Sequence, residues 1–531
     1  MNYSFDGDLG GNGRLDAENA LSLRSPKRAF SGHDAIFAWL CTLMGILLAR
    51  AVPITQNTFG AFICFCLLFS LGAVYIKLSG VRQSKSSVCF FAVALVFSLG
   101  LITGSNKAIL TVLAIFIFCA FLYWVYSAFG LNGGRVLGKD LLMHGLTALF
   151  GSPVLSVWYI FPAFAHSEGD GGTKKAGKTV LLILAGLGCA FVPTAIVIFL
   201  LSYDKQFTDI MNKILAFDVI DVIDFVGDLF FGMILAMMIF GVLFGSKLRR
   251  KIYGGEKKWD KKLSLNVMPR VLLCSMITPI LAVYAVFFVS QWDYYISAFT
   301  GSLPEPLTYA EYARSGFFQL CAVCAINALL LLMFSLLLGK KENKKGDALK
   351  AVYSAVISVF TLILIATALS KMILYIDSYG LTRKRVYASW LMILLAVIFA
   401  VVLLRLVIKK ISLPAVTVAV CIVFFGIIAL PDTDAMIASY NADAYLSGEL
   451  SYVDVESMAD YGDSAVPALV RLYESLDKEE LSETERALYT ETEQALRKLK
   501  FEKANATEGI FSFNIPSFRA KLLLNELSLD K

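Results

Sequence analysis

The sequence predicts an all-α protein: a polytopic bundle of about eleven transmembrane helices, followed by a small helical domain outside the membrane. Of its 531 residues, 57% are hydrophobic and only 17% are charged, whereas soluble proteins carry about 25% charged residues. The apolar residues are gathered in runs of about 20, the length that a helix needs to cross the hydrocarbon core. In lipid each backbone N–H must be satisfied within its own segment, so we expect these runs to be helical.

The first segment, residues 1–34, is polar and rich in Gly, Asp and Asn, and we expect a disordered cytoplasmic tail. Residues 35–430 are expected to form the transmembrane domain. Most of its apolar runs carry no charge across the hydrocarbon thickness. The eleven predicted spans are residues 35–54, 59–77, 87–104, 108–129, 179–201, 229–246, 270–290, 317–338, 352–370, 387–408 and 412–430.

Residues 145–167 are apolar and uncharged but are interrupted by Gly151, Ser152, Pro153 and Pro162. Proline removes a backbone donor and disfavours a continuous helix. A twelfth span here would also weaken the charge asymmetry of the loops. We therefore expect an interfacial or re-entrant element.

Basic residues predict the orientation. With the N-terminus in the cytoplasm, the inner loops and their flanks hold 25 Lys and Arg, and the outer loops hold nine. Positive flanks resist translocation, so this asymmetry places the C-terminus outside. The strongest inner block is the loop 247–270. We expect a multi-pass protein of the plasma membrane, with the lipid bilayer as its surroundings.

The tail, residues 431–531, is predicted to be an acidic helical extracytoplasmic domain. It holds ten Lys and Arg against twenty Asp and Glu. Leu469, Leu472 and Leu476 recur at helical spacing, and Ser482 with Glu485 forms an S-x-x-E capping box. A basic membrane part with an acidic tail follows from charge-sorted topology, so we expect no nucleic-acid partner. A protein partner at the tail is expected instead.

No motif assigns catalytic chemistry, and we expect no catalytic, cofactor-binding or metal-binding residues. Residues 172–179 satisfy the phosphate-loop pattern, but a predicted span follows them, and their three lysines are better explained as an inner-face anchor. Cys321 and Cys324 form a C-x-x-C pair within a span, where buried, inert thiols are expected. Asn327 is the most polar mid-span residue; we interpret its amide as a hydrogen-bonding group between helices, although it could line a polar path.

The candidate functional site is a polar site at the outer face. Positive charge on the translocated side is disfavoured, so the basic loop between the ninth and tenth spans is expected to have an acidic partner. A helical stripe of four aspartates precedes the sixth span. Alternatively, the stripe is the solvated face of an interfacial helix and the basic side chains meet lipid phosphates. The residues of the candidate site are Asp218, Asp221, Asp224, Asp228, Glu311, Arg314, Lys371, Tyr375, Tyr379, Arg383 and Arg385.

Several stretches carry a family resemblance. They are residues 309–318, 370–388, 439–441 and 463–467, together with Phe513, Asn514, Arg519 and Ala520. Together they cover about 265–525, and they resemble a family of bacterial membrane proteins known as domain of unknown function 4173, related to 4153. The resemblance implies an integral membrane protein and supplies no activity, cofactor or catalytic residue.

Two classes of function follow. The first is a non-catalytic envelope or signalling protein that binds a partner or signal at its outer face. The alternative is a transporter of a neutral or lipophilic solute. An outer domain and few polar groups at membrane depth favour the first class. An enzyme acting on lipid at the outer face is a third possibility, supported only by the polar outer loops.

The predicted orientation can be tested by accessibility. A protease added to intact cells with permeabilised outer layers should remove the tail and leave the loop 247–270 uncut, because only the tail is expected outside. A single cysteine engineered into that loop should resist an impermeant thiol reagent until lysis. Labelling of this cysteine in intact cells would contradict the orientation.

Overall fold

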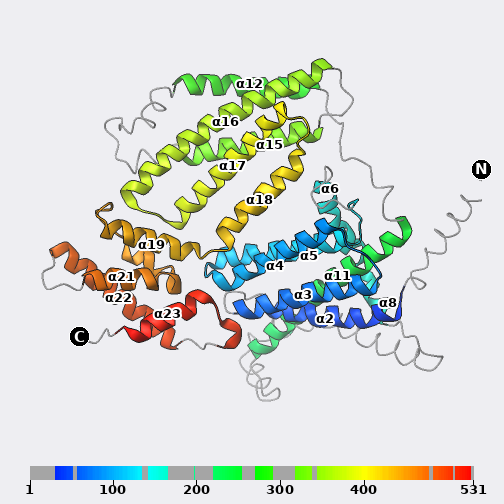
Figure 1. Cartoon of the computed structure of the whole chain (residues 1–531), viewed down its shortest axis with the longest axis horizontal. Coiled ribbons are helices and arrows are strands. Elements are labelled where there is room, and N and C mark those ends of the chain that lie inside the picture. The colour runs from blue at the N-terminus through cyan, green and yellow to red at the C-terminus, as the bar shows by residue number, and fades with distance from the viewer. Residues whose placement is uncertain are drawn as a thin grey trace, which may run out of the picture. The chain divides into compact units, whose positions relative to one another are not determined.

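The chain is almost entirely helical. The computed structural model describes residues 30–51, 57–133, 141–164, 197, 219–253, 270–290, 317–337, 344–476, 482–505 and 509–527. No strand occurs in these residues, which confirms the all-α class. The chain divides into two compact units (Figure 1). The N-terminal unit comprises residues 1–98, 114–136 and 142–260, and the C-terminal unit comprises 99–113, 137–141 and 261–531.

The helices confirm a polytopic membrane protein. Eight helices in the described part of the chain are long and apolar enough to cross a membrane, and a ninth is counted if α18 and α19, bent by 61°, form one span. The count of eleven stays a prediction. The span expected at 179–201 lies outside the described residues, apart from Val197. Two others have described apolar parts of only Ser275–Ser290 and Gln319–Leu331.

In its described residues, the N-terminal unit contains five long helices and one segment of short helical turns. Its helices are α2 (Gly32–Ala51), α3 (Thr58–Leu78), α4 (Lys85–Thr103), α5 (Lys107–Ala128), α6 (Leu141–Leu146), η2 (Thr147–Gly151), α7 (Ser152–Ser156), η3 (Val157–Tyr159), α8 (Ile160–Phe164) and α11 (Val219–Tyr253). The turn between α4 and α5 belongs to the C-terminal unit.

Small residues let α11 approach its neighbours closely. A Cβ atom added at Gly45 of α2 would lie 2.2 Å from the carbonyl oxygen of Gly232 in α11. One added at Gly241 of α11 would lie 2.7 Å from the carbonyl oxygen of Pro153 in α7. Membrane helices gain van der Waals contact in this way, because lipid supplies no hydrophobic force between them.

The interrupted segment corresponds to the element expected at 145–167. The π-helical turn η2 ends at Gly151, where the sequence predicts an interruption, and the 3₁₀ turn η3 lies between α7 and α8. Met143–Phe164 is nevertheless one of the eight helical segments with the length and composition of a span. Whether it spans the membrane or lies at the interface stays a prediction.

A buried ion pair joins α2 to α11. Asp34, in the first turn of α2, is fully buried, and Lys247 Nζ lies 2.9 Å from its Oδ1 atom. The Tyr75 hydroxyl donates to the same oxygen at 2.8 Å. The backbone N–H and the hydroxyl of Ser31 donate to Oδ2 at 2.7 and 2.9 Å. The sequence placed Asp34 at the end of the polar tail and Lys247 in the basic inner block, so their pairing was not predicted.

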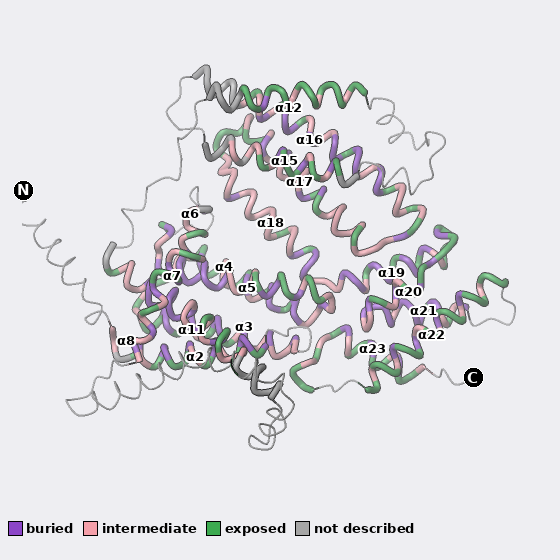
Figure 2. The backbone as a smooth tube through the Cα atoms, turned by 180° about the vertical axis from the view of Figure 1, so that it is seen from behind, coloured by how far each residue is buried: buried purple, intermediate pink, exposed green. Residues whose placement is uncertain are grey.

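The C-terminal unit begins with five long helices. They are α12 (Arg270–Ser290), α15 (Phe317–Leu337), α16 (Lys344–Tyr379), α17 (Arg383–Val407) and α18 (Leu413–Ala429). The first four share a core cluster that includes Ile277, Cys324, Met372 and Phe399. Figure 2 shows that α12 is mostly exposed, as expected of a helix whose apolar side chains face lipid.

Asn327 holds three of these helices together. The Tyr284 hydroxyl of α12 donates to its Oδ1 atom at 2.8 Å, and its Nδ2 atom donates to the Thr361 hydroxyl of α16 at 2.9 Å. The interpretation of Asn327 as an interhelical hydrogen-bonding residue is therefore confirmed.

Five helices in the described part of the tail share one hydrophobic cluster. They are α19 (Thr433–Leu446), α20 (Val455–Ala459), α21 (Val466–Leu476), α22 (Glu483–Asn505) and α23 (Ile515–Glu526); the short 3₁₀ turns η4 (Gly462–Ser464) and η5 (Ile510–Ser512) lie between them in the chain. The predicted leucines of α21 lie in this cluster, and the capping box of Ser482 and Glu485 is formed. Leu381 and Val386, beside the turn between α16 and α17, pack against the same cluster. Because the tail belongs to one compact unit with these helices, the domain boundary at 431 stays a prediction.

Replacing the buried cation of the N-terminal unit should lower stability. Lys247→Met would leave the Asp34 carboxylate buried without its counter-charge, at an expected cost of about 3 kcal/mol. Lys251→Met, at an exposed position one turn later, is the matched control and should have little effect. Thermal unfolding of the detergent-purified protein measures both. Equal melting temperatures for the two variants would show that the pair does not stabilise the unit.

Candidate functional site

A polar pocket lies at the turn between α16 and α17. Its volume is about 250 Å³. One side is formed by Ser378, Tyr379, Leu381, Thr382 and Arg385, next to two membrane helices. The other side is formed by tail residues, namely Asn441, Leu450, Ser451, Tyr452, Val453, Asp454, Ser457, Met458 and Tyr461. The pocket therefore joins a helical hairpin of the membrane part to the tail.

Arg385 supplies the positive charge of the pocket. Its guanidinium lies over the Tyr375 ring at 3.9 Å from the ring centroid and 6.0 Å from that of Tyr379. Its Nη1 atom donates to the carbonyl oxygens of Tyr379, at 2.8 Å, and of Gly380. Aromatic faces attract a cation and hold its plane in a fixed direction. Since a guanidinium has five N–H donors on three nitrogens, Nε and Nη2 can still bind an acceptor in the pocket.

The turn itself has a fixed conformation. Gly380 ends α16 with φ +70°, a left-handed conformation that favours glycine, and an added Cβ atom would lie 2.6 Å from Asn441 Oδ1. Asn441 binds both backbone groups of the next residue: the Leu381 N–H donates to Oδ1 at 2.6 Å, and Nδ2 donates to the Leu381 carbonyl at 2.9 Å. Two of the stretches that carry the family resemblance, 370–388 and 439–441, meet at this contact.

Beside the pocket, Arg383 binds a buried carboxylate of the tail. Its Nε atom donates to Asp434 Oδ1 at 2.9 Å and its Nη2 atom to Oδ2 at 2.8 Å. Asp434 is only 1% exposed. Asn106, from the turn between α4 and α5, donates to both oxygens at 3.3 and 3.2 Å. The guanidinium also lies 4.5 Å from the ring centroid of Tyr461. This two-pronged geometry is specific to arginine.

A second carboxylate lies where α18 ends. Asp432 caps the N-terminus of α19, accepting from the Ala435 N–H at 3.2 Å and from the Ser464 hydroxyl at 2.6 Å. Ser464 in turn shares a hydrogen bond with Ser105. Burial raises the pKa of the Asp432 carboxyl above its ordinary value, and these hydrogen bonds oppose only part of the increase.

Four of the predicted site residues lie in or beside the pocket: Tyr375, Tyr379, Arg383 and Arg385. Arg383 has the acidic partner that the topology argument requires, but this partner is Asp434 of the tail. Lys371 is buried in α16. Arg383 thus has a carboxylate partner from the tail, while the outer polar site that the sequence predicts stays a prediction.

The other predicted residues are not brought to this pocket by any described contact. Asp228 belongs to the N-terminal unit. The side chains of Asp221 and Asp224, and all of Asp218, Glu311 and Arg314, lie outside the described residues, as does the phosphate-loop pattern at 172–179. The pairing of the aspartate stripe with Arg383 and Arg385 stays a prediction.

Sequence reasoning missed Asp434 and Asn106. Asp434 was counted only as part of the acidic tail, although its position in the first turn of a helix that directly follows a span is a usable signal. Asn106 lies in a three-residue turn between two spans, where nothing in the sequence indicates its partner. Among the described residues, no group of His, Cys, Asp and Glu could hold a metal ion.

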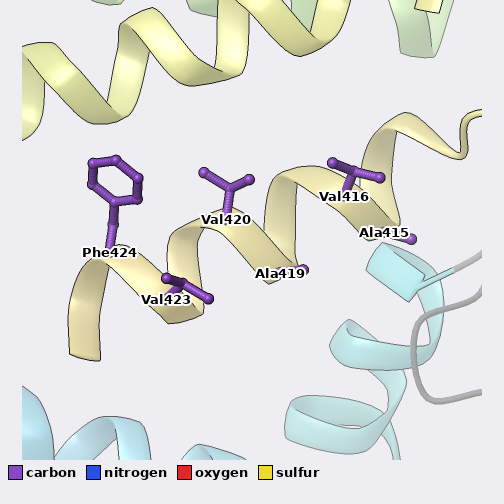
Figure 3. Close-up of a pocket in the computed structure, with 6 residues that line it drawn as sticks. All are labelled: Ala415, Val416, Ala419, Val420, Val423 and Phe424. Atoms are coloured by element: carbon purple, nitrogen blue, oxygen red, sulfur yellow. The ribbon is translucent and has the colours of Figure 1, made fainter. Parts of the chain in front are cut away.

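Two apolar grooves lie on membrane helices. One runs along α18 and is lined by Ala415, Val416, Ala419, Val420, Val423 and Phe424 (Figure 3). The other lies on α12 and α16 around Phe288 and Phe360. Figure 3 shows that only hydrocarbon side chains line the α18 groove, so lipid chains can fill it. Neither groove supplies the polar groups of a specific site.

The family comparison covers most of the chain. Residues 63–472 match the model of a family described as a domain of unknown function, DUF4153. The chain belongs to this family. The match extends the family relationship into the first half, which the sequence motifs did not cover, and it includes every pocket residue but not α22 and α23. The narrower resemblance to 4173 stays an expectation. Comparison with curated proteins and with solved structures finds no match.

The raised pKa of Asp432 predicts a pH dependence. A carboxyl whose pKa is higher in the folded than in the unfolded state contributes stability at low pH and loses it as the pH rises through the folded-state pKa. Asp432→Asn keeps the helix-capping oxygen and removes the charge. Its melting temperature relative to wild type should therefore increase from acidic to neutral pH.

The control for this experiment is Asp454→Asn, at the exposed N-cap of α20. It makes the same isosteric change at a capping carboxylate that is exposed, and its pH profile is the reference for the effect of burial. A constant difference between Asp432→Asn and wild type across the pH range would contradict the prediction.

Proposed function

We propose that this protein is a non-catalytic membrane protein that binds a signal or a protein partner at its outer face, in the pocket between the α16–α17 turn and the tail. In this proposal the protein lies in the plasma membrane, its N-terminus is cytoplasmic, and the pocket and the tail are outside. The observation that carries the proposal is the composition of the pocket wall, to which a hairpin of membrane helices contributes five residues and the tail nine.

The chemistry of the pocket suits recognition of a small polar group. Arg385 offers N–H donors held in a plane by Tyr375 and Tyr379, which suits an acceptor such as a carboxylate. The pocket volume of about 250 Å³ is slightly smaller than that of typical small-molecule sites, which begin at about 300 Å³. A small ligand, or a single side chain of a partner protein, fits this space.

One carboxylate that lines the pocket already has a structural role. Asp454 is occupied as the N-cap of α20: it accepts from the Ser457 N–H at 2.9 Å and from the Ser457 hydroxyl at 2.6 Å. Nucleophilic catalysis by a serine requires an adjacent general base, and a capping carboxylate is a poor candidate for one. This favours binding over chemistry at the site.

The surrounding contacts can transmit binding to the membrane helices. The tail is held on the hairpin by Arg383 and Asp434 and by Asn441 and Leu381. A ligand that contacts both sides of the pocket binds only the state in which the tail contacts the hairpin, and so it increases the population of that state. In this proposal the two states of the protein differ in whether the tail contacts the α16–α17 turn.

Contacts within the C-terminal unit support the placement of three loops on the same side of the membrane. Asn106, Arg383 and Asp434 lie in three chain segments that the predicted topology places outside, and they bind one another. Loops on opposite sides of a bilayer could not meet, since the hydrocarbon core is about 30 Å thick.

Filling the pocket tests the proposal. Ser451→Trp places a large side chain at the wall of the pocket, whereas Glu449→Trp makes the same change two residues away, outside the pocket. In cells that carry the gene, Ser451→Trp should reproduce the transcriptional response caused by complete deletion, and Glu449→Trp should resemble wild type. Immunoblots of membrane fractions check that both variants accumulate normally.

Deletion of residues 431–531 should give the same response as Ser451→Trp. If Ser451→Trp behaves as wild type while complete deletion has a clear phenotype, the pocket is not the functional site. Solute flux that survives deletion of the tail would favour a transporter instead.

A further inference from the structure

The last part of the tail has an unusual surface. Helix α23 is apolar on two opposite faces. Pro516, Ala520 and Leu524, spaced four residues apart, form one buried stripe, of which Ala520 and Leu524 belong to the tail core. Ile515, Phe518 and Leu522 form a second stripe that is exposed. At about 100° per residue, the centres of the two stripes lie about half a turn apart.

The residues before α23 extend the exposed apolar surface. Ile510 is 80% exposed and Phe511 is 61% exposed, both in η5. Phe513 is also exposed, and its ring lies 5.9 Å from that of Phe518. Soluble surfaces rarely gather large apolar side chains in this way, and such patches mark interaction sites. We define the terminal patch as the exposed apolar residues Ile510, Phe511, Phe513, Ile515, Phe518 and Leu522.

Basic side chains border the terminal patch. Arg519 and Lys521 are exposed. On a helical projection they lie on either side of the stripe of Ile515, Phe518 and Leu522, and one exposed carboxylate, Glu526, lies on the same face at the end of the helix. An apolar stripe between cationic side chains is typical of helices that lie in the membrane interface, where the cations reach the lipid phosphates. This arrangement favours an anionic lipid surface over a protein of unknown composition.

A chain of contacts links α23 to the ends of membrane helices. Lys503 of α22 binds Ser517 of α23 and, at 2.8 Å, Asp463 of η4. The next residue, Ser464, binds Asp432, three residues after the end of α18, and Ser105 in the turn between α4 and α5. The start of α23 is thus linked through η4 to the ends of three membrane helices.

We propose that the terminal patch docks on the surface of the same membrane that the chain spans, with its apolar side chains among the lipid headgroups and its basic side chains at the phosphates of anionic phospholipids. The occupant of the patch is lipid. This surface lies outside the region matched by the family model and is separate from the pocket at the α16–α17 turn.

Photo-cross-linking of the full chain tests this proposal. Phe518 is replaced by p-benzoylphenylalanine, an aromatic of similar shape at an exposed position, and the purified protein is placed in nanodiscs of phosphatidylethanolamine and phosphatidylglycerol. The same change at Tyr452, which is also exposed but lies away from the patch, is the matched control. After irradiation, mass spectrometry should find several-fold more phospholipid adduct at position 518 than at position 452. A second reporter at Phe511 should behave as position 518 does.

A second experiment tests whether the basic side chains are needed for contact with anionic lipid. The double change Arg519→Gln and Lys521→Gln should lower the adduct yield at position 518 in nanodiscs with phosphatidylglycerol, and much less in nanodiscs of phosphatidylcholine alone. Lipid adducts at positions 518 and 511 no more abundant than at 452 would overturn the proposal. So would cross-links to a second copy of the chain in place of lipid.

Discussion

The C-terminal unit depends on the burial of Asp434. A carboxylate with 1% exposure must have a counter-charge and filled hydrogen-bonding positions, because an unpaired buried charge is strongly destabilising. Arg383 supplies two parallel hydrogen bonds and Asn106 supplies further ones. These groups come from three separate loops, so the carboxylate is satisfied only when all three are assembled. The interaction therefore contributes to specificity, since another arrangement of the tail would leave both charges unpaired.

The pocket is a consequence of the same assembly. Arg383 and Arg385 are two residues apart at the start of α17 and point to different partners: the first binds the tail, and the second packs on Tyr375 and binds the carbonyls at the end of α16. The N-cap of α17, Thr382, and the positive φ of Gly380 fix the direction of both. With the tail held by Arg383, the space in front of Arg385 is enclosed by residues 450–461 and becomes a pocket. Arg383 holds one wall of the pocket in place, and Arg385 lines the pocket.

Much of this fold can be predicted from local sequence, but its contacts cannot. Hydropathy identifies the apolar helices, and the leucines of α21 and the capping box of α22 follow from spacing alone, because each depends on residues three or four positions apart. The partner of Arg383 is 51 residues away in the sequence, and that of Asp34 is 213 residues away. The charge rule indicated a partner for the basic loop, yet it could not choose between the aspartate stripe at the start of α11, the acidic tail and lipid phosphates. That choice depends on which loops the packing of the helices brings together.

The contact between Asn106 and Asp434 also bears on the number of spans. Asn106 lies between α4 and α5, and it also binds the Tyr387 hydroxyl near the start of α17. Both positions must lie on one side of the bilayer, so the chain crosses an even number of times between them. If α5, α11, α12, α15 and α16 each cross once, that makes five crossings, and an odd number must come from the remaining apolar segments, 143–164 and 179–201. Eleven spans would require that only one of these two segments crosses, so the count of eleven and the choice between the segments stay predictions. In the described segment that ends at Phe164, the π-helical and 3₁₀ turns interrupt the regular backbone hydrogen bonds that lipid favours, and this supports the interfacial or re-entrant element that the sequence predicts there.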